Sequence, residues 1–174
     1  MFQNFTGRKI CKWNAEKRRT VMPSDLKGNL VGEGLGEKLV IVKNMYDKCL
    51  NVYSEAEWDK HVAKLREMPQ KTRESIWAIR YYVGGAVHCD MDAQGRFVLP
   101  KDDQSNLLGE AGLCEYAGIT DVDEVLIEGN VNHAQIWSIE NWKAANDMSR
   151  MGALAETNDD AVHASLGTQF DYAY

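Results

Sequence analysis

The sequence lacks long hydrophobic runs. No stretch approaches the roughly 18 consecutive apolar residues that suggest a membrane-spanning helix. The first residues, MFQNFTGRKICKW, also lack the apolar segment of a secretory signal peptide. We therefore expect a cytoplasmic protein without membrane segments.

Metal-binding and redox motifs are missing as well. The cysteines include no C-x-x-C pair, and the histidines lack the paired spacing of a zinc site. Scattered cysteines suit small buried thiols in a reducing compartment. We expect no metal and no cofactor. The four cysteines are Cys11, Cys49, Cys89 and Cys114.

Catalytic patterns are absent too. No Ser, Cys or Thr is paired with a base at a recognisable spacing, and no carboxylate pair stands in an apolar loop. The glycine-rich stretch 28–38 is no phosphate-binding loop, because Glu37 separates its last glycine from Lys38. The sequence predicts that the protein is not an enzyme.

The chain does contain an uneven distribution of charge. Its net charge is −6, but residues 1–30 hold seven Lys or Arg against two acidic residues. Residues 102–174 hold two basic residues against fourteen acidic ones. Either these charges only keep the surface solvated, or residues 1–30, the basic head of the chain, bind phosphate groups.

Short motifs indicate an internal duplication. NAEKRRTVMP, residues 14–23, matches DAQGRFVLP, residues 92–100, with an arginine four positions before a proline in each. VYSEAEW, which ends at Trp58, matches IWSIENW, which ends at Trp142. The two halves are offset by 77 positions at the arginines and 84 at the tryptophans. We therefore expect about seven additional residues in the second half, within 101–113.

Each half predicts the same order of elements: strand, tight turn, strand, short helix, strand, turn, strand and helix. Ser54 and Glu57 have the capping-box spacing, and Ser138 should cap the equivalent helix more weakly. Pro69 separates two helices between the halves. The expected helices are Glu55–Glu67, Lys71–Val83 and one that follows Trp142 to about Met151.

The second loop motif gives each residue a physical role. Gly95 permits a positive φ, Asp92 can accept backbone N–H groups within the turn, and Pro100 ends the strand. Arg96 then projects from a rigid turn. An exposed guanidinium can hold a phosphate or the O6 and N7 edge of guanine. From this loop alone, a plain β-turn with a solvated arginine is the alternative.

These loops, the element EYAGI and the stretches EVLIEG and IWSIENW resemble the MraZ family, a double version of the AbrB-type DNA-binding fold. The resemblance runs from about Phe5 to Trp142 and is closest in the second half. It implies an α+β, mainly β fold, in which two swapped AbrB-like units related by a pseudo-twofold form a small barrel with flanking helices. The expected parts are the repeats 5–60 and 87–150, the connecting helices 61–86, and an acidic polar segment, 151–174.

The resemblance also implies a function. MraZ-like proteins would repress transcription, their own promoter included, by binding repeated G-rich boxes in double-stranded DNA as ring-shaped homo-oligomers in the nucleoid. We expect a ring interface around Tyr81, Tyr82 and the helix after Ser54. The expected DNA-contacting residues are Arg8, Lys12, Asn14, Lys17, Arg18, Arg19, Gln94 and Arg96.

The first loop departs from the family pattern. Asn14 or Ala15 replaces the aspartate, and Arg18 stands where glycine is expected. A left-handed conformation costs about 1 kcal/mol or more for a residue with a Cβ. Either the loop has a new shape with one more positive charge, or it keeps phosphate contact and loses base reading.

Two other functions remain open. The chain could be a ring-forming scaffold that no longer reads DNA, which would suit its net charge and its altered first loop. It could instead be an antitoxin-like regulator whose acidic C-terminal segment captures a basic protein partner. The basic head favours DNA, because a scaffold does not need it.

Overall fold

The protein folds around a single antiparallel sheet that closes almost completely into a barrel. The computed structural model describes residues 5–30, 37–67, 72–101 and 103–155. The strand order is β1-β7-β8-β4-β3-β5-β6-β2, and the end strands β1 and β2 contact each other. The strands are β1 (Arg8–Lys12), β2 (Arg19–Val21), β3 (Glu37–Lys43), β4 (Leu50–Ser54), β5 (Val87–Met91), β6 (Arg96–Val98), β7 (Glu124–Asn130) and β8 (His133–Trp137).

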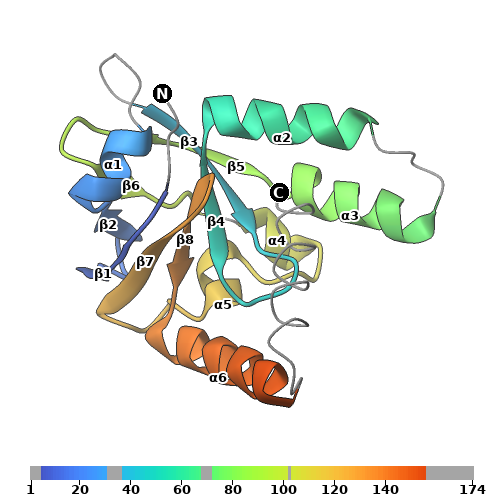
Figure 1. Ribbon diagram of the computed structural model, residues 1–174. Helices are drawn as coiled ribbons and strands as arrows, with labels where there is room; N and C mark the ends of the chain where they lie inside the picture. Colours follow the sequence, from blue (N-terminus) through green and yellow to red (C-terminus); the bar gives the residue numbers. More distant parts are fainter. Residues whose placement is uncertain (1–4, 31–36, 68–71, 102, 156–174) are drawn as a thin grey trace.

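Six helices in the described ranges flank this sheet, and the expected α+β, mainly β class is confirmed (Figure 1). None of these helices is long and apolar enough to cross a membrane. The helices are α1 (Ser24–Leu30), α2 (Glu55–Glu67), α3 (Arg73–Gly84), α4 (Asp103–Leu107), α5 (Leu113–Ala117) and α6 (Ile139–Ala155).

The two halves exchange strands. β1 of the first half pairs with β7 of the second, β5 of the second pairs with β3 of the first, and β2 pairs with β6. The β2–β6 pair centres on Thr20 and Phe97, which are 77 positions apart. The β4–β8 pair centres on Asn51 and Gln135, which are 84 apart. Both offsets expected from the sequence are therefore confirmed by the register of the sheet, and the exchange is the expected pseudo-twofold swap.

The additional residues of the second half are divided differently from the expectation. Val40 pairs with Tyr53, and Leu126 pairs with Trp137, so β3 and β7 are 86 positions apart. The offset between equivalent residues is 77 at β2 and β6 and rises to 86 at β3 and β7, because the second half contains α4 and α5 between these strands. It then falls to 84 at β4 and β8, because the β7–β8 turn is two residues shorter than the β3–β4 turn. The net gain of seven is as expected, but it combines a longer insertion with a shorter turn.

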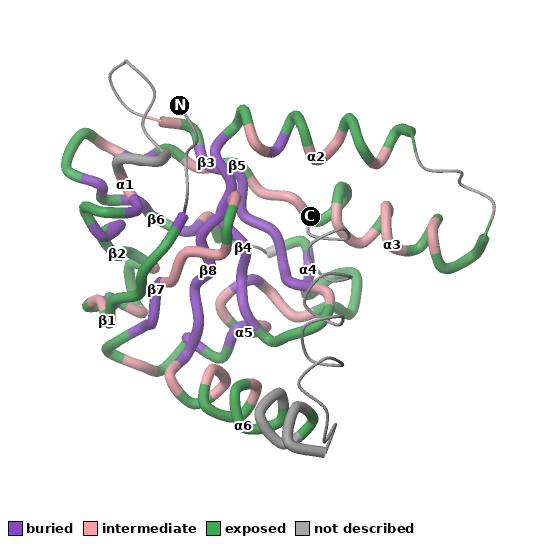
Figure 2. Tube along the Cα trace, viewed as in Figure 1, coloured by how far each residue is buried: buried purple, intermediate pink, exposed green. Residues whose placement is uncertain are grey.

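The core consists of a barrel interior and two smaller clusters beneath helices. Its buried residues lie mainly along the central strands of the sheet (Figure 2). Under α2, Trp58 packs with Val40 and Tyr53. Under α6, Trp142 packs against Leu126 and Trp137, which are the equivalents of Val40 and Tyr53. The expectation that the two tryptophans occupy equivalent places is confirmed.

The expected Ser138 cap is confirmed, but the last helix starts earlier than expected. Helix α6 begins at Ile139 rather than after Trp142, and the Asn141 N–H donates to Ser138 Oγ at 3.0 Å. The same bond joins the Glu57 N–H to Ser54 Oγ at 3.2 Å, and α2 has its expected bounds. Pro69, Asp102, most of the acidic segment and part of the glycine-rich stretch lie outside the described residues.

A buried histidine, His133, predicts sensitivity to acid. His133 is fully buried and stacks on Tyr53 at 4.8 Å, and Tyr53 also stacks on His61 at 5.6 Å. Burial, reinforced by the nearby His61, lowers the pKa of His133 to about 3. Below about pH 6.5 the unfolded chain therefore takes up a proton that the folded chain does not, so the free energy of unfolding decreases as the pH is lowered.

We expect protonation of His133 in the unfolded chain to lower the free energy of unfolding by about 2 kcal/mol when the pH is lowered from 7 to 5. Urea unfolding at both pH values would measure the loss. In His133→Gln the difference between the two pH values should shrink by that amount, whereas the exposed His88→Gln control should resemble wild type. An unchanged pH difference in His133→Gln would contradict the assignment.

Candidate nucleic-acid interface

The two loop motifs form the same kind of turn. Loop 1 (residues 13–18) joins β1 to β2, and loop 2 (residues 92–95) joins β5 to β6. Asn14 and Arg19 exchange backbone hydrogen bonds of 2.9 and 3.1 Å, and the Asp92 N–H donates to the Arg96 carbonyl at 2.9 Å. Asn14, rather than Ala15, therefore occupies the place of Asp92.

The side chains of these two residues organise their loops from within. Asn14 Oδ1 accepts the Lys17 N–H at 2.8 Å. Asp92 Oδ1 accepts the N–H groups of Gln94 and Arg96 at 3.0 and 2.9 Å. The hydrogen bond from the Arg96 backbone, aided by its side chain, lowers the pKa of Asp92. Both loops are thus held in defined turns, and the stretch from Asn14 to Arg19 has one more residue than the stretch from Asp92 to Arg96.

Arg18 keeps the conformation of the glycine that it replaces. Its φ is 51°, and Gly95 in loop 2 has a φ of 83°. The Leu99 N–H donates to the Arg18 carbonyl, and the Met22 N–H donates to the Gly95 carbonyl, each at 2.8 Å. These two bonds cross between the halves in equivalent positions, so both loops are anchored in the same way.

The Arg18 side chain folds back onto the protein. It is half-buried, and its Nε donates to the Leu99 carbonyl at 3.0 Å. This hydrogen bond links residues 81 positions apart and ties loop 1 to the second half. It also helps to offset the left-handed backbone of a residue with a Cβ.

We expect Arg18→Ala to lower the free energy of unfolding by about 1 kcal/mol, because it loses this bond and stays left-handed. Arg18→Gly loses the same bond but relieves backbone strain of about 1 kcal/mol, so its free energy of unfolding should be closer to that of the wild type. Urea denaturation at one protein concentration compares the three proteins. A glycine variant less stable than the alanine variant would contradict this account.

Arg19 and Arg96 differ in their partners. Both are exposed, but Arg96 Nε makes an ion pair with Asp92 Oδ2 at 2.7 Å. In loop 1 the neutral Asn14 replaces the aspartate, and Arg19 makes no side-chain hydrogen bond or ion pair within the described ranges. The guanidinium of Arg19 therefore presents its full set of donors to solvent, while that of Arg96 is partly held in place.

Comparison with known proteins decides the family. No protein-family model matches the chain. It is 35% identical over 126 residues to the transcriptional regulator MraZ of Caldicellulosiruptor bescii, covering 72% of this chain and 76% of that protein. The MraZ of Thermoanaerobacter sp. is 33% identical over 146 residues, 83% of this chain and 90% of that protein. The MraZ of Acetivibrio thermocellus is 31% identical over 137 residues, 79% and 83% of the two chains. The chain belongs to the MraZ family of transcriptional regulators.

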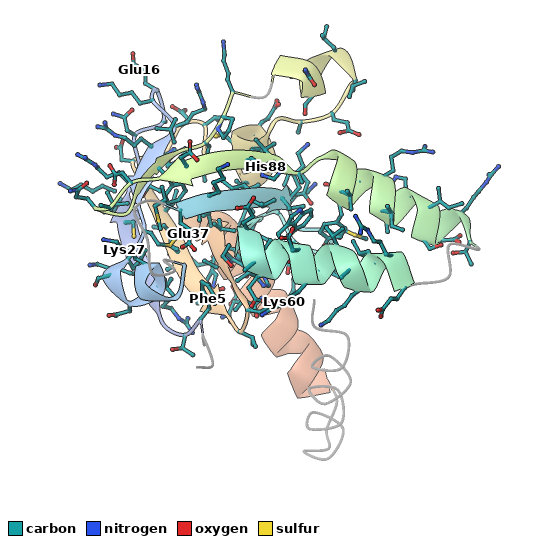
Figure 3. The ribbon with its side chains drawn as sticks, turned by 90° about the horizontal axis from the view of Figure 1, so that it is seen from above. Phe5, Glu16, Lys27, Glu37, Lys60 and His88 are labelled. Carbon is teal, nitrogen blue, oxygen red and sulfur yellow. The ribbon has the colours of Figure 1, made fainter. Side chains whose placement is uncertain are left out.

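In this MraZ-family chain, basic side chains of both halves meet at one end of the molecule. β1, β2, β6 and α1 gather there, away from α2 and α3 (Figure 1), and Glu16 and Lys27 mark the same end in Figure 3. Lys9, Lys12, Lys27 and Gln94 line a hollow of about 480 Å³ there. A phosphate-bearing ligand is the natural counterpart of such a surface.

Sequence reasoning missed Lys9 and Lys27 as members of this surface. Lys27 Nζ donates to the Ala93 carbonyl of loop 2, 66 positions away. No local signal could show this, because the swap of strands places α1 against the second loop. Of the residues expected to contact DNA, Arg8 lies apart: its guanidinium stands 5.1 Å above the Trp142 ring and 4.0 Å from Glu128.

An acidic cleft borders loop 1 on its other side. This cleft has a volume of about 1200 Å³, and its walls include Asp121, Asp123, Glu124 and Glu140. Arg19 lines both this cleft and a hollow of about 540 Å³ that it shares with Arg96. On the β2–β6 side, Asp90 and Asp92 line the hollow together with the two arginines, so the charges there balance. A polyanion is therefore repelled less strongly from this side of Arg19 than from the acidic cleft.

Proposed function

We propose that this protein is a sequence-specific DNA-binding repressor that recognises repeated G-rich promoter boxes as a cyclic homo-oligomer in the nucleoid. The observation that carries the proposal is the pair of equivalent loops, which present Arg19 and Arg96 at one basic end. The transcriptional regulators to which the chain is similar support the same role.

The chemistry of this end suits duplex DNA. An arginine fork can donate two hydrogen bonds to the O6 and N7 atoms of guanine. Lys12 and Lys17 are exposed beside the loops and suit phosphate contacts, which position a protein without reading sequence. Arg18 contributes charge and holds loop 1, since its Nε is already engaged. Arg8 would be an outer contact.

Repeated boxes call for several copies at fixed spacing, because one module offers few contacts. We place the interface between copies on α3, which has no buried residue. Trp77 is 53% exposed and Ile76 44%, and Trp77 stacks on Tyr81 at 5.1 Å. Tyr82 belongs to the body instead, since its hydroxyl accepts the Met45 N–H at 3.2 Å.

A salt titration tests the proposal. The wild-type protein should bind a duplex of repeated G-rich boxes more tightly than a scrambled duplex of the same length. For both duplexes, log affinity should fall linearly with log salt concentration. Equal binding to the two duplexes, or none, would favour the ring scaffold, and capture of a basic protein would favour the antitoxin-like regulator.

Lys17→Ala separates phosphate contact from base reading. We expect it to weaken binding to matched and scrambled duplexes alike and to lower the salt slope by about one contact. Lys64→Ala, an exposed position on α2, is the charge-matched control and should leave the slope unchanged. A loss confined to the matched duplex would make Lys17 a base reader instead.

A further inference from the structure

The β2–β6 ribbon exposes two valines beside its two arginines. Thr20 and Phe97 pair at its centre and point inward, each 2% exposed. The neighbouring positions point outward, where Val21 is 46% exposed and Val98 is 44% exposed. Val21 lies directly opposite Arg96, and Val98 directly opposite Arg19. Arginine and valine thus alternate on the outer face of the ribbon.

The four outward positions of the ribbon carry the same residues in both halves, unlike the inward pair between them. The outward residues are the same in both, Arg19 matching Arg96 and Val21 matching Val98 at the offset of 77. The inward pair between them, Thr20 and Phe97, differs completely in size and polarity. The core therefore does not dictate this agreement, and an external ligand that meets both halves alike would account for it.

A two-stranded ribbon of this kind fits the major groove, which is about 12 Å wide. The apolar feature that this groove displays is the C5-methyl group of thymine, and apolar side chains contact it. Residues directly opposite on antiparallel strands have Cβ atoms about 4.5–5.5 Å apart. That separation is closer to one base step, about 3.4 Å, than to several.

We propose that Val21 and Val98 read thymine methyl groups next to the guanines that Arg96 and Arg19 bind. This inference rests on the proposed function and deepens it: the preferred site contains guanine beside thymine, once for each half of the ribbon. The four-residue outer face, rather than the arginines alone, then determines sequence preference.

The test compares thymine with deoxyuridine, which lacks only the methyl group. One duplex carries repeated G-rich boxes with thymine on each side of the guanines, and a second has every thymine replaced by deoxyuridine. Wild type should bind the thymine duplex at least about fourfold more tightly, the worth of one buried methyl-sized group. The double variant Val21→Ala/Val98→Ala should bind both duplexes alike.

Controls separate the possible outcomes. Val131→Ala removes another half-exposed valine, at the far end of β7, and should keep the wild-type preference for thymine. Circular dichroism melting checks that the double variant is folded. Wild type that prefers boxes over scrambled DNA but ignores the methyl group overturns this inference alone, as does a double variant that still discriminates. Wild type without preference for boxes overturns the proposed function as well.

Discussion

Arg19→Ala is expected to weaken binding to a G-rich duplex by about 1–3 kcal/mol and to flatten the preference for it over a scrambled duplex. Arg19 is exposed, has no counter-ion within the described ranges, and stands on the rim shared by the acidic cleft and the hollow beside Arg96. Fluorescence anisotropy with both duplexes at several salt concentrations would measure the two effects.

Arg96→Ala should have the same kind of effect with a smaller magnitude. Its Nε is bound to Asp92, and one terminal nitrogen donates to Gln94 Oε1 at 3.5 Å, so fewer of its donors are free for a base. Asp92 also adds a negative charge close to the phosphates. Asp92→Asn would make loop 2 resemble loop 1, so it should strengthen binding to all duplexes and steepen the salt dependence. Arg66→Ala on α2 is the control. An Arg19 variant indistinguishable from wild type would shift support to the scaffold.

The duplication could be predicted from the sequence because its markers are local. Each half has an arginine four positions before a proline and a serine four positions before a tryptophan. The distances between the two copies of these motifs equal the offsets seen in the register of β2–β6 and β4–β8. The start of α2 follows from the serine cap in the same way. Where the cap signal was judged weak, at Ser138, the start of the helix was placed too late.

The remaining features of the site depend on contacts between the halves. The acceptor for Arg18 Nε is a carbonyl 81 positions away, and Lys27 reaches loop 2 across 66 positions. The direction of Val21 and Val98 follows from a strand pair that joins the two halves. The residue pattern within either half does not contain this information. Which side chains of the site are exposed, and which charges lie close together, could therefore be known only from the three-dimensional structure.

Trp77→Glu is expected to convert the proposed ring into monomers and to lower affinity for a duplex of three boxes by about 100-fold, the usual scale of lost multivalency. The side chain is half-exposed on a helix without buried residues, beside Ile76 and a hollow of about 610 Å³ that also includes Arg73 and Arg80. A carboxylate there would be desolvated in an apolar contact between copies. Sedimentation velocity at micromolar concentration measures the assembly state.

A duplex with a single box distinguishes assembly from direct contact. If α3 acts only through assembly, Trp77→Glu should bind one box as wild type does, because the basic end lies away from α3 (Figure 1). Met148→Glu introduces the same charge at an apolar position on α6 that is 75% exposed, and it should keep both the ring and the three-box affinity. A monomeric wild type would remove the ring from this account. Equal losses on one box and three boxes would instead place α3 within the DNA contact, since avidity needs at least two occupied sites.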